Sequence, residues 1–111
     1  MTDKLALAQK LSKILGWDDM LVQVALPCLN SIINQFVFQQ CDCFGVPIED
    51  VEANLEEDML KLSSDALWRL LVEDFCEDYN PCSLYIDFRE EIEHYMKQGY
   101  TFKQAIYEWD L

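Results

Sequence analysis

The most reactive side chains in this sequence belong to five cysteines and one histidine. Thiolate and imidazole groups are the usual ligands of zinc, so these residues could together hold a metal ion. Structural zinc sites usually include a Cys-x-x-Cys pair, however, and this chain has none. An odd number of cysteines without a secretory signal also favours reduced thiols over a disulfide framework. We therefore expect no cofactor and no metal at Cys28, Cys41, Cys43, Cys76, Cys82 or His94.

Carboxylates are the other candidates for catalysis, because a positioned pair can act as general acid and general base. The chain has 21 acids, and pairs of acids occur by chance in a sequence of this composition. No nucleophile motif, phosphate-binding glycine loop or metal-binding pair accompanies the single histidine. The sequence therefore predicts a protein that is not an enzyme.

The acids are concentrated in one part of the chain, and their distribution excludes some partners. Residues 49–93 hold fifteen acids and three bases, a net charge of -12 out of -13 for the whole chain. Direct binding to nucleic acid is disfavoured, because affinity for phosphates comes from lysine and arginine. Binding to a basic protein is favoured, because opposite charges accelerate encounter.

Some of these acids occupy unfavourable positions. Glu73 and Glu77, and likewise Asp74 and Asp78, are like-charged pairs four residues apart near the end of an expected helix. Each pair costs about 0.2–0.5 kcal/mol, and the helix macrodipole is negative at this end. Only Arg69, four residues before Glu73, offsets the repulsion. The acids form either a solvated face that keeps the protein soluble or a surface that binds a partner.

The helical arc of Asp74 and Asp78 also contains Leu70 and Leu71, so we expect this helix end to project from the core. It would then combine carboxylates with aromatic anchors, among them Tyr85 and Trp68. The predicted partner-binding residues are Glu56, Glu57, Glu73, Asp74, Glu77, Asp78 and Tyr79.

These residues can act together only in a folded protein, and the amino-acid composition of the chain favours a helical fold. Apolar residues make up 51% of the chain, whereas three glycines and three prolines are too few for the turns of a β-sandwich. We predict an all-α fold: one domain over residues 1–111, a compact bundle of about five to six helices. An α+β fold is the alternative, in which residues 36–38 and 84–86 form a small β-hairpin.

Capping residues locate the expected helices. We expect one helix to begin at Asp3 and end at Gly16, the next to begin at Asp18 or Asp19, and a later one to begin at Ser63 or Ser64. Pro27 should kink or divide the second helix. A single apolar stripe is expected over residues 48–62, and capping boxes over residues 87–90 and 101–104.

Residues 20–41 form a long stretch without charge. Amide side chains and Pro27 interrupt it, which disfavours a membrane span. An uncharged helix of this kind is suited to the centre of a core or to a subunit contact. The N-terminus lacks the pattern of a secretory signal, so a cytoplasmic location is expected.

Together these features favour a non-enzymatic protein-binding module. Carboxylates on rigid helices can imitate the spacing of phosphates, as in small phage or mobile-element inhibitors of host defence. Such a surface could block a basic nucleic-acid-binding protein, for example a defence nuclease or a CRISPR effector. The alternative is a homo-oligomeric structural or adaptor protein that uses the uncharged helix 20–40, with the acids serving solubility.

Overall fold

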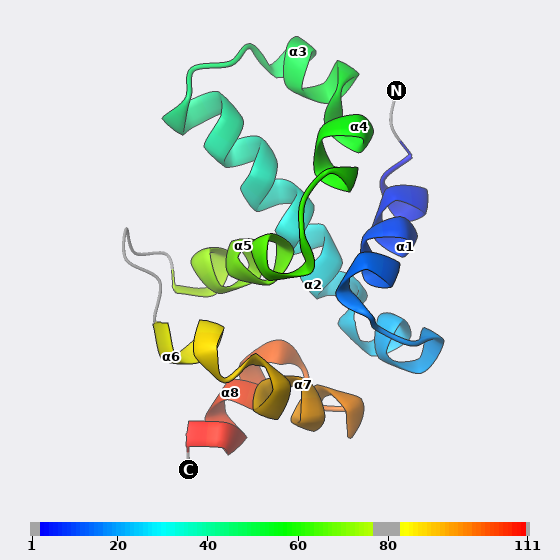
Figure 1. Cartoon of the computed structure of the whole chain (residues 1–111), viewed down its shortest axis with the longest axis vertical. Helices are drawn as coiled ribbons and strands as arrows, with labels where there is room; N and C mark the ends of the chain where they lie inside the picture. The colour runs from blue at the N-terminus through cyan, green and yellow to red at the C-terminus, as the bar shows by residue number, and fades with distance from the viewer. Residues whose placement is uncertain (1–2, 77–82, 111) are drawn as a thin grey trace.

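A 20-residue helix, α2 (Asp19–Phe38), lies at the centre of the fold (Figure 1). It contacts α1 (Lys4–Leu15), α3 (Ile48–Ala53), α5 (Ser64–Cys76) and α7 (Arg89–Lys97). The computed structural model describes residues 3–76 and 83–110. The prediction that the uncharged segment is a central core helix is confirmed, because one side of α2 is buried through Leu21, Ala25, Leu29, Ile32, Ile33 and Phe36.

The remaining helices are α4 (Leu55–Leu60), α6 (Ser83–Asp87) and α8 (Phe102–Asp110), and a π-helical turn, η1 (Gln39–Cys43), extends α2. The structure is 83% helical, with eight α-helices and no strand among the described residues. The all-α prediction is therefore confirmed. The hairpin alternative is wrong: residues 36–38 belong to α2 and residues 84–86 to α6, because the core contacts of Phe36 outweigh local strand propensity.

Several predicted caps are present in the structure. The Asp3 carboxylate accepts hydrogen bonds from the backbone of Leu5 and Ala6, and Gly16 ends α1 with a φ of 77°. The backbone N–H of Leu21 donates to Asp18 at 2.8 Å, and that of Ala66 donates to Ser63 at 3.1 Å. Thr101 and Gln104 form the expected reciprocal capping box, at 3.1 and 3.2 Å.

Helix α2 continues through Pro27 without division, since the buried residues on both sides hold it against α1, α5 and α7. Two other local predictions are wrong. The stripe over residues 48–62 is split into α3 and α4 at Asn54, whose side chain donates to the carbonyl oxygen of Asp50 and competes with the helical ladder. Residues 87–90 form no capping box, because Asp87 ends α6 and Phe88 precedes α7 without a side-chain cap.

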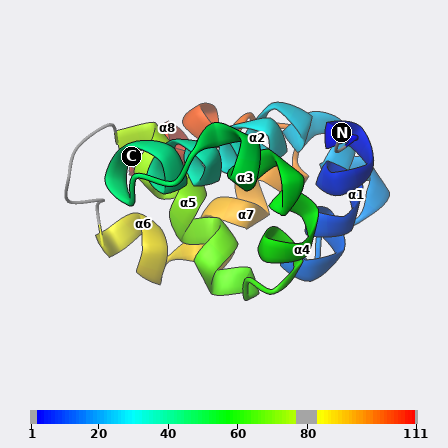
Figure 2. The same ribbon diagram turned by 90° about the horizontal axis from the view of Figure 1, so that it is seen from above.

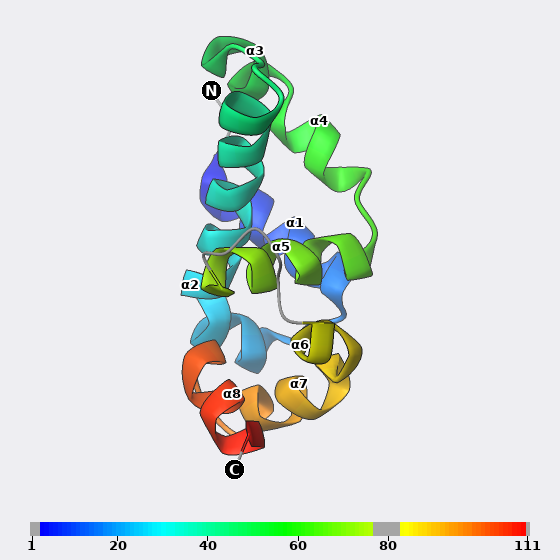
Figure 3. The same cartoon turned by 90° about the vertical axis from the view of Figure 1, so that its left-hand side faces the viewer.

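The molecule is a thin slab that measures 42 × 31 × 19 Å. Helices α2 and α8 lie along one broad face, and α4 and α6 lie along the opposite one (Figures 2 and 3). Buried side chains between these faces form one core, which includes Trp68, Leu29, Met59 and Ile92. By length and composition alone, the stretch Asp19–Cys43 could cross a membrane, a test that the core helix of a globular protein also passes.

Candidate partner-binding surface

The first two predicted binding residues lie on α4, and both form ion pairs. Glu56 pairs with Lys10 of α1, and Glu57 pairs with Lys61 at 3.5 Å. All four side chains are exposed, so each pair contributes about 0–1 kcal/mol to stability. These contacts reduce the local negative charge of α4 without removing the carboxylates from solvent.

Glu73 and Asp74 lie in the last turn of α5. Glu73 accepts hydrogen bonds from Arg69 at 3.1 Å and from the Gln39 side chain, and it is mostly buried. Asp74 is half-buried. The predicted projection of this helix end is therefore wrong as far as Cys76, because Phe75 and Cys76 are partly buried against the core. The predicted residues Glu77, Asp78 and Tyr79 lie outside the described residues.

The structure does not bring the predicted binding residues into one cluster. Helix α4 lies near the start of α5, whereas Glu73 and Asp74 lie at the other end of that helix (Figure 1). Trp68 is not a surface anchor, because it is fully buried and its indole N–H donates to the Tyr85 carbonyl oxygen at 2.9 Å. Tyr85 itself is half-buried, with its ring against Phe75 and Trp109.

The structure reveals a second group of acids that the sequence reasoning did not single out. A hollow of about 590 Å³ lies between the start of α5 and the segment formed by α6 and α7. Its acidic side chains surround one arginine, Arg89. The acids are Asp65, Asp87, Glu90, Glu91 and Glu93. Four of them fall within residues 87–93, a density that a shorter charge-counting window would have detected.

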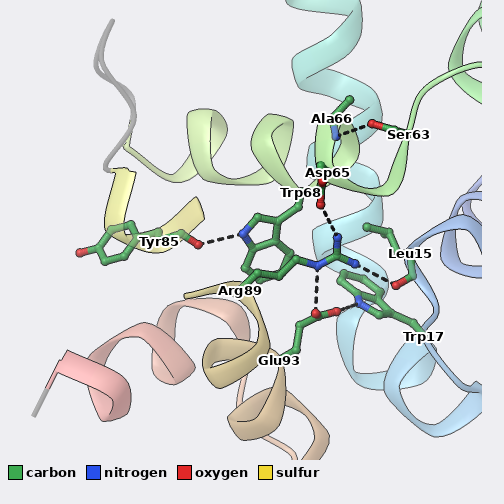
Figure 4. Close-up of polar contacts among 9 residues, drawn as sticks. All are labelled: Leu15, Trp17, Ser63, Asp65, Ala66, Trp68, Tyr85, Arg89 and Glu93. Carbon is green, nitrogen blue, oxygen red and sulfur yellow. Dashed lines mark hydrogen bonds and ion pairs between the residues drawn. The ribbon is translucent and has the colours of Figure 1, made fainter. Parts of the chain in front are cut away.

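Arg89 joins helices α1, α5 and α7 beneath this hollow (Figure 4). Its guanidinium donates to Glu93 at 2.9 Å, to Asp65 at 3.4 Å and to the Leu15 carbonyl oxygen at 2.9 Å. It also lies over the Trp68 ring at 5.5 Å, close enough for a cation–π contact. Its side chain is only 16% exposed and that of Glu93 only 13%, so this pair is largely shielded from water, whereas the Asp65 side chain is 96% exposed.

Glu93 extends this network to the α1–α2 connection, because it also accepts a hydrogen bond from the indole N–H of Trp17. The positive charge of Arg89 is thus neutralised by its ion pairs with Glu93 and Asp65. No ion pair within the described residues involves the exposed carboxylates of Asp87, Glu90 and Glu91. These three acids therefore lie at the surface of a segment that Arg89 holds in place, and no ion pair within the described residues neutralises them.

A similar excess of acid occurs on α3 and α4. Residues 48–60 contain six acids and no base. Among them, Asp58 is exposed and has no ion pair in the described part of the chain. Asp65, at the start of α5, lines the hollow, and α4 ends only a few residues before it at Leu60. We call the exposed acids of α4, the start of α5 and α6–α7 the acidic face: Glu56, Glu57, Asp58, Asp65, Asp87, Glu90 and Glu91.

The cysteines provide no comparable site. Cys28, Cys41, Cys43 and Cys76 are free thiols, and the described residues contain no group of three or more metal-ligating side chains. The pKa of the Cys28 thiol is raised from 9.0 to about 11, mainly by burial; a hydrogen bond with the Phe102 backbone lowers this pKa, and the nearby Asp74 carboxylate adds to the rise. Such a thiol is a poor nucleophile at neutral pH.

Comparison with protein-family models, with curated proteins and with solved structures finds no match to this chain.

Proposed function

We propose that this chain is a non-enzymatic protein-binding module whose acidic face binds a basic, nucleic-acid-binding protein. One observation carries the proposal: Asp87, Glu90 and Glu91 line one hollow, and neither these acids nor the exposed Asp58 of α4 form an ion pair within the described residues. A face that served only solubility would need no such concentration, because interspersed charges of both signs achieve the same result.

The rigidity of the acidic face supports binding by imitation of nucleic acid. Arg89 holds α7 against α1 and α5, so the carboxylates of α6–α7 are arranged before the partner arrives. Prearranged charges lose little conformational entropy on binding and accelerate encounter with a basic surface. A partner that normally binds phosphates, such as a defence nuclease or a CRISPR effector, has a surface of this kind.

Aromatic rings border the acidic face and can act as anchors. Glu90 and Glu91 also line a second hollow of about 300 Å³, together with Tyr95 and Trp109. Phe88, which is 40% exposed, packs against the Trp109 ring at 5.4 Å between centroids. Aromatic groups beside charges are typical of the residues that dominate binding energy at protein interfaces.

Competition with DNA tests the proposal. The protein is immobilised, proteins are captured from a lysate of its host at low salt, and a duplex oligonucleotide is then added. We expect basic nucleic-acid-binding proteins to be captured and then released by the oligonucleotide, because both ligands require the same cationic surface. Captured proteins that stay bound in the presence of the duplex would contradict the proposal.

A further inference from the structure

The hollow of about 300 Å³ that borders the acidic face combines carboxylates with aromatic rings. It is lined by Glu90, Glu91, His94 and Tyr95 of α7 and by Trp109 of α8. At about 100° per residue, the four residues of α7 fall within an arc of roughly 140°, so they share one side of that helix. The ring of Trp109 completes the hollow from the neighbouring helix.

The carboxylates of this hollow are available to a ligand. Glu90 and Glu91 are exposed, and neither forms an ion pair in the described part of the chain. The lysines and the arginine of α7 and α8 do not line the hollow: they are Arg89, Lys97 and Lys103. The charge of the hollow is therefore complementary to a cation.

The aromatic rings of the hollow are fixed by other rings. Trp109 packs against Phe88, at 5.4 Å between ring centroids, and edge-on against Tyr85, at 5.9 Å. Tyr95 contacts the His94 ring edge-on at 5.8 Å. Aromatic rings attract cations through their negative faces, and tryptophan does so most strongly. Fixed rings beside carboxylates thus add a second attraction that is specific to organic cations.

The neighbouring hollow shows which cation this combination of side chains accepts. There, the Arg89 guanidinium lies over the Trp68 ring at 5.5 Å and donates to Glu93 at 2.9 Å (Figure 4). Trp109 and its two glutamates repeat the combination of indole ring and carboxylate without an arginine. A guanidinium stacks on aromatic rings and donates to carboxylates in parallel, whereas the ammonium of lysine is compact and more strongly hydrated.

We propose that the hollow formed by α7 and α8 binds an arginine side chain of the basic partner, with the guanidinium against the Trp109 ring and its N–H groups donating to Glu90 and Glu91. The inference rests on the proposed function for the source of the arginine, and it adds which side chain is recognised and where. A lysine in the same place keeps the attraction between opposite charges but loses most of the stacking.

Titration with two short peptides of equal charge tests the site. Isotope-labelled protein is titrated with acetyl-Gly-Arg-Gly amide or with acetyl-Gly-Lys-Gly amide and followed by NMR. We expect the arginine peptide to bind about three- to tenfold more tightly and to shift the indole N–H signal of Trp109. The indole N–H groups of Trp17 and Trp68 are hydrogen-bonded inside the protein, so their signals should not move.

Variants of equal net charge separate the hollow from general attraction between opposite charges. Glu90→Gln combined with Glu91→Gln should weaken binding of the arginine peptide about fivefold, because both acceptors lose their charge. Asp42→Asn combined with Asp58→Asn is the matched control, since both acids are exposed and neither lines the hollow. This control should bind the peptide as the wild type does.

Trp109→Leu tests the ring separately from the charge. With its fold verified by circular dichroism and binding followed by the backbone amide signals of α7, this variant should bind the arginine and lysine peptides equally. Equal affinity of the wild type for both peptides, or unchanged binding by the variant of Glu90 and Glu91, would overturn the inference. Neither result affects the DNA-competition test of the proposed function, and a failure of that test leaves the peptide results unchanged, so the two proposals can fail separately.

Discussion

Arg89 connects the C-terminal end of α1 with α5 and α7, and its removal should strongly destabilise the fold. Arg89→Ala leaves Glu93 and the Leu15 carbonyl oxygen without their cation in a site that is largely shielded from water. We expect a loss of about 2–4 kcal/mol in the free energy of unfolding, measured by urea denaturation.

Arg69 is the matched control for Arg89. It forms the same Arg-to-Glu pair over four residues, with Glu73, but its side chain is 62% exposed. Arg69→Ala should cost less than about 0.5 kcal/mol. Equal losses for the two variants would show that Arg89 does not organise the fold as described.

The buried thiol of Cys28 should respond to pH. Its pKa is about 11 in the folded protein against an ordinary value of 9.0, so the unfolded chain releases this proton first as the pH rises. The contribution of Cys28 to stability is therefore complete below about pH 9 and is lost as the pH rises from 9 to 11. Comparison of urea denaturation for the wild type and Cys28→Ala should show their stabilities converging over this interval. A difference that stays constant with pH would contradict the assigned pKa.

Helix α8 begins with a capping box that a single substitution can remove. The Thr101 hydroxyl accepts a hydrogen bond from the backbone N–H of Gln104, and the Gln104 side chain accepts one from that of Thr101. Thr101→Ala should lower the free energy of unfolding by about 1 kcal/mol, measured by thermal or urea denaturation. Thr101→Ser keeps the hydroxyl and should retain most of the stability. If Thr101→Ser lowers the free energy of unfolding as much as Thr101→Ala does, loss of the capping hydrogen bond does not cause the decrease.

The elements that could be predicted from sequence are those set by neighbouring residues. The capping residues act within one helical turn, so their types and spacing were sufficient to predict the ends of the helices. These residues are Asp3, Gly16, Asp18 and Thr101. The continuity of α2 through Pro27 could not be predicted, because it depends on packing against helices that are distant in sequence.

The acidic site could be predicted only in part, for the same reason. Counting charges by segment located the acids, but not their partners. Glu56 meets Lys10, 46 residues earlier in the chain, and Glu73 meets Gln39, 34 residues earlier. The contacts of Arg89 with Leu15 and Asp65 are also long-range. Which acids remain uncompensated is therefore a property of the fold.

The α5 end and the acidic face can be tested separately for the proposed binding. Changing Glu73, Asp74, Glu77 and Asp78 to Gln or Asn should preserve the fold and slow association with a basic partner. We expect a smaller effect than for an equal number of changes on the acidic face, since Glu73 is already paired with Arg69. Stopped-flow association rates at low salt compare the two variants. A larger effect at the α5 end would place the main contact there.

Over the whole molecule, the acids without an ion pair are not confined to one face. Asp87, Glu90 and Glu91 gather around one hollow, whereas the exposed acids Asp19 and Glu108 belong to α2 and α8, which lie along the broad face opposite α4 and α6. Net charge alone does not predict which acids gather at the hollow, because that depends on the fold.

The most direct test of the acidic face compares two variants of equal net charge. One changes four uncompensated acids of the acidic face to their amides: Asp58, Asp87, Glu90 and Glu91. The control changes four acids outside residues 49–93 in the same way: Asp19, Asp42, Glu108 and Asp110. Both variants have a net charge of -9 instead of -13, since each loses four carboxylates.

The measurement is affinity capture from a lysate of the host at low and high salt, with the wild type and both variants as bait and circular dichroism to verify their folds. We predict that the wild type and the control capture the same basic protein at low salt and release it at high salt, while the acidic-face variant captures little of it. Equal capture by both variants would contradict the account, because net charge rather than the acidic face would then determine binding.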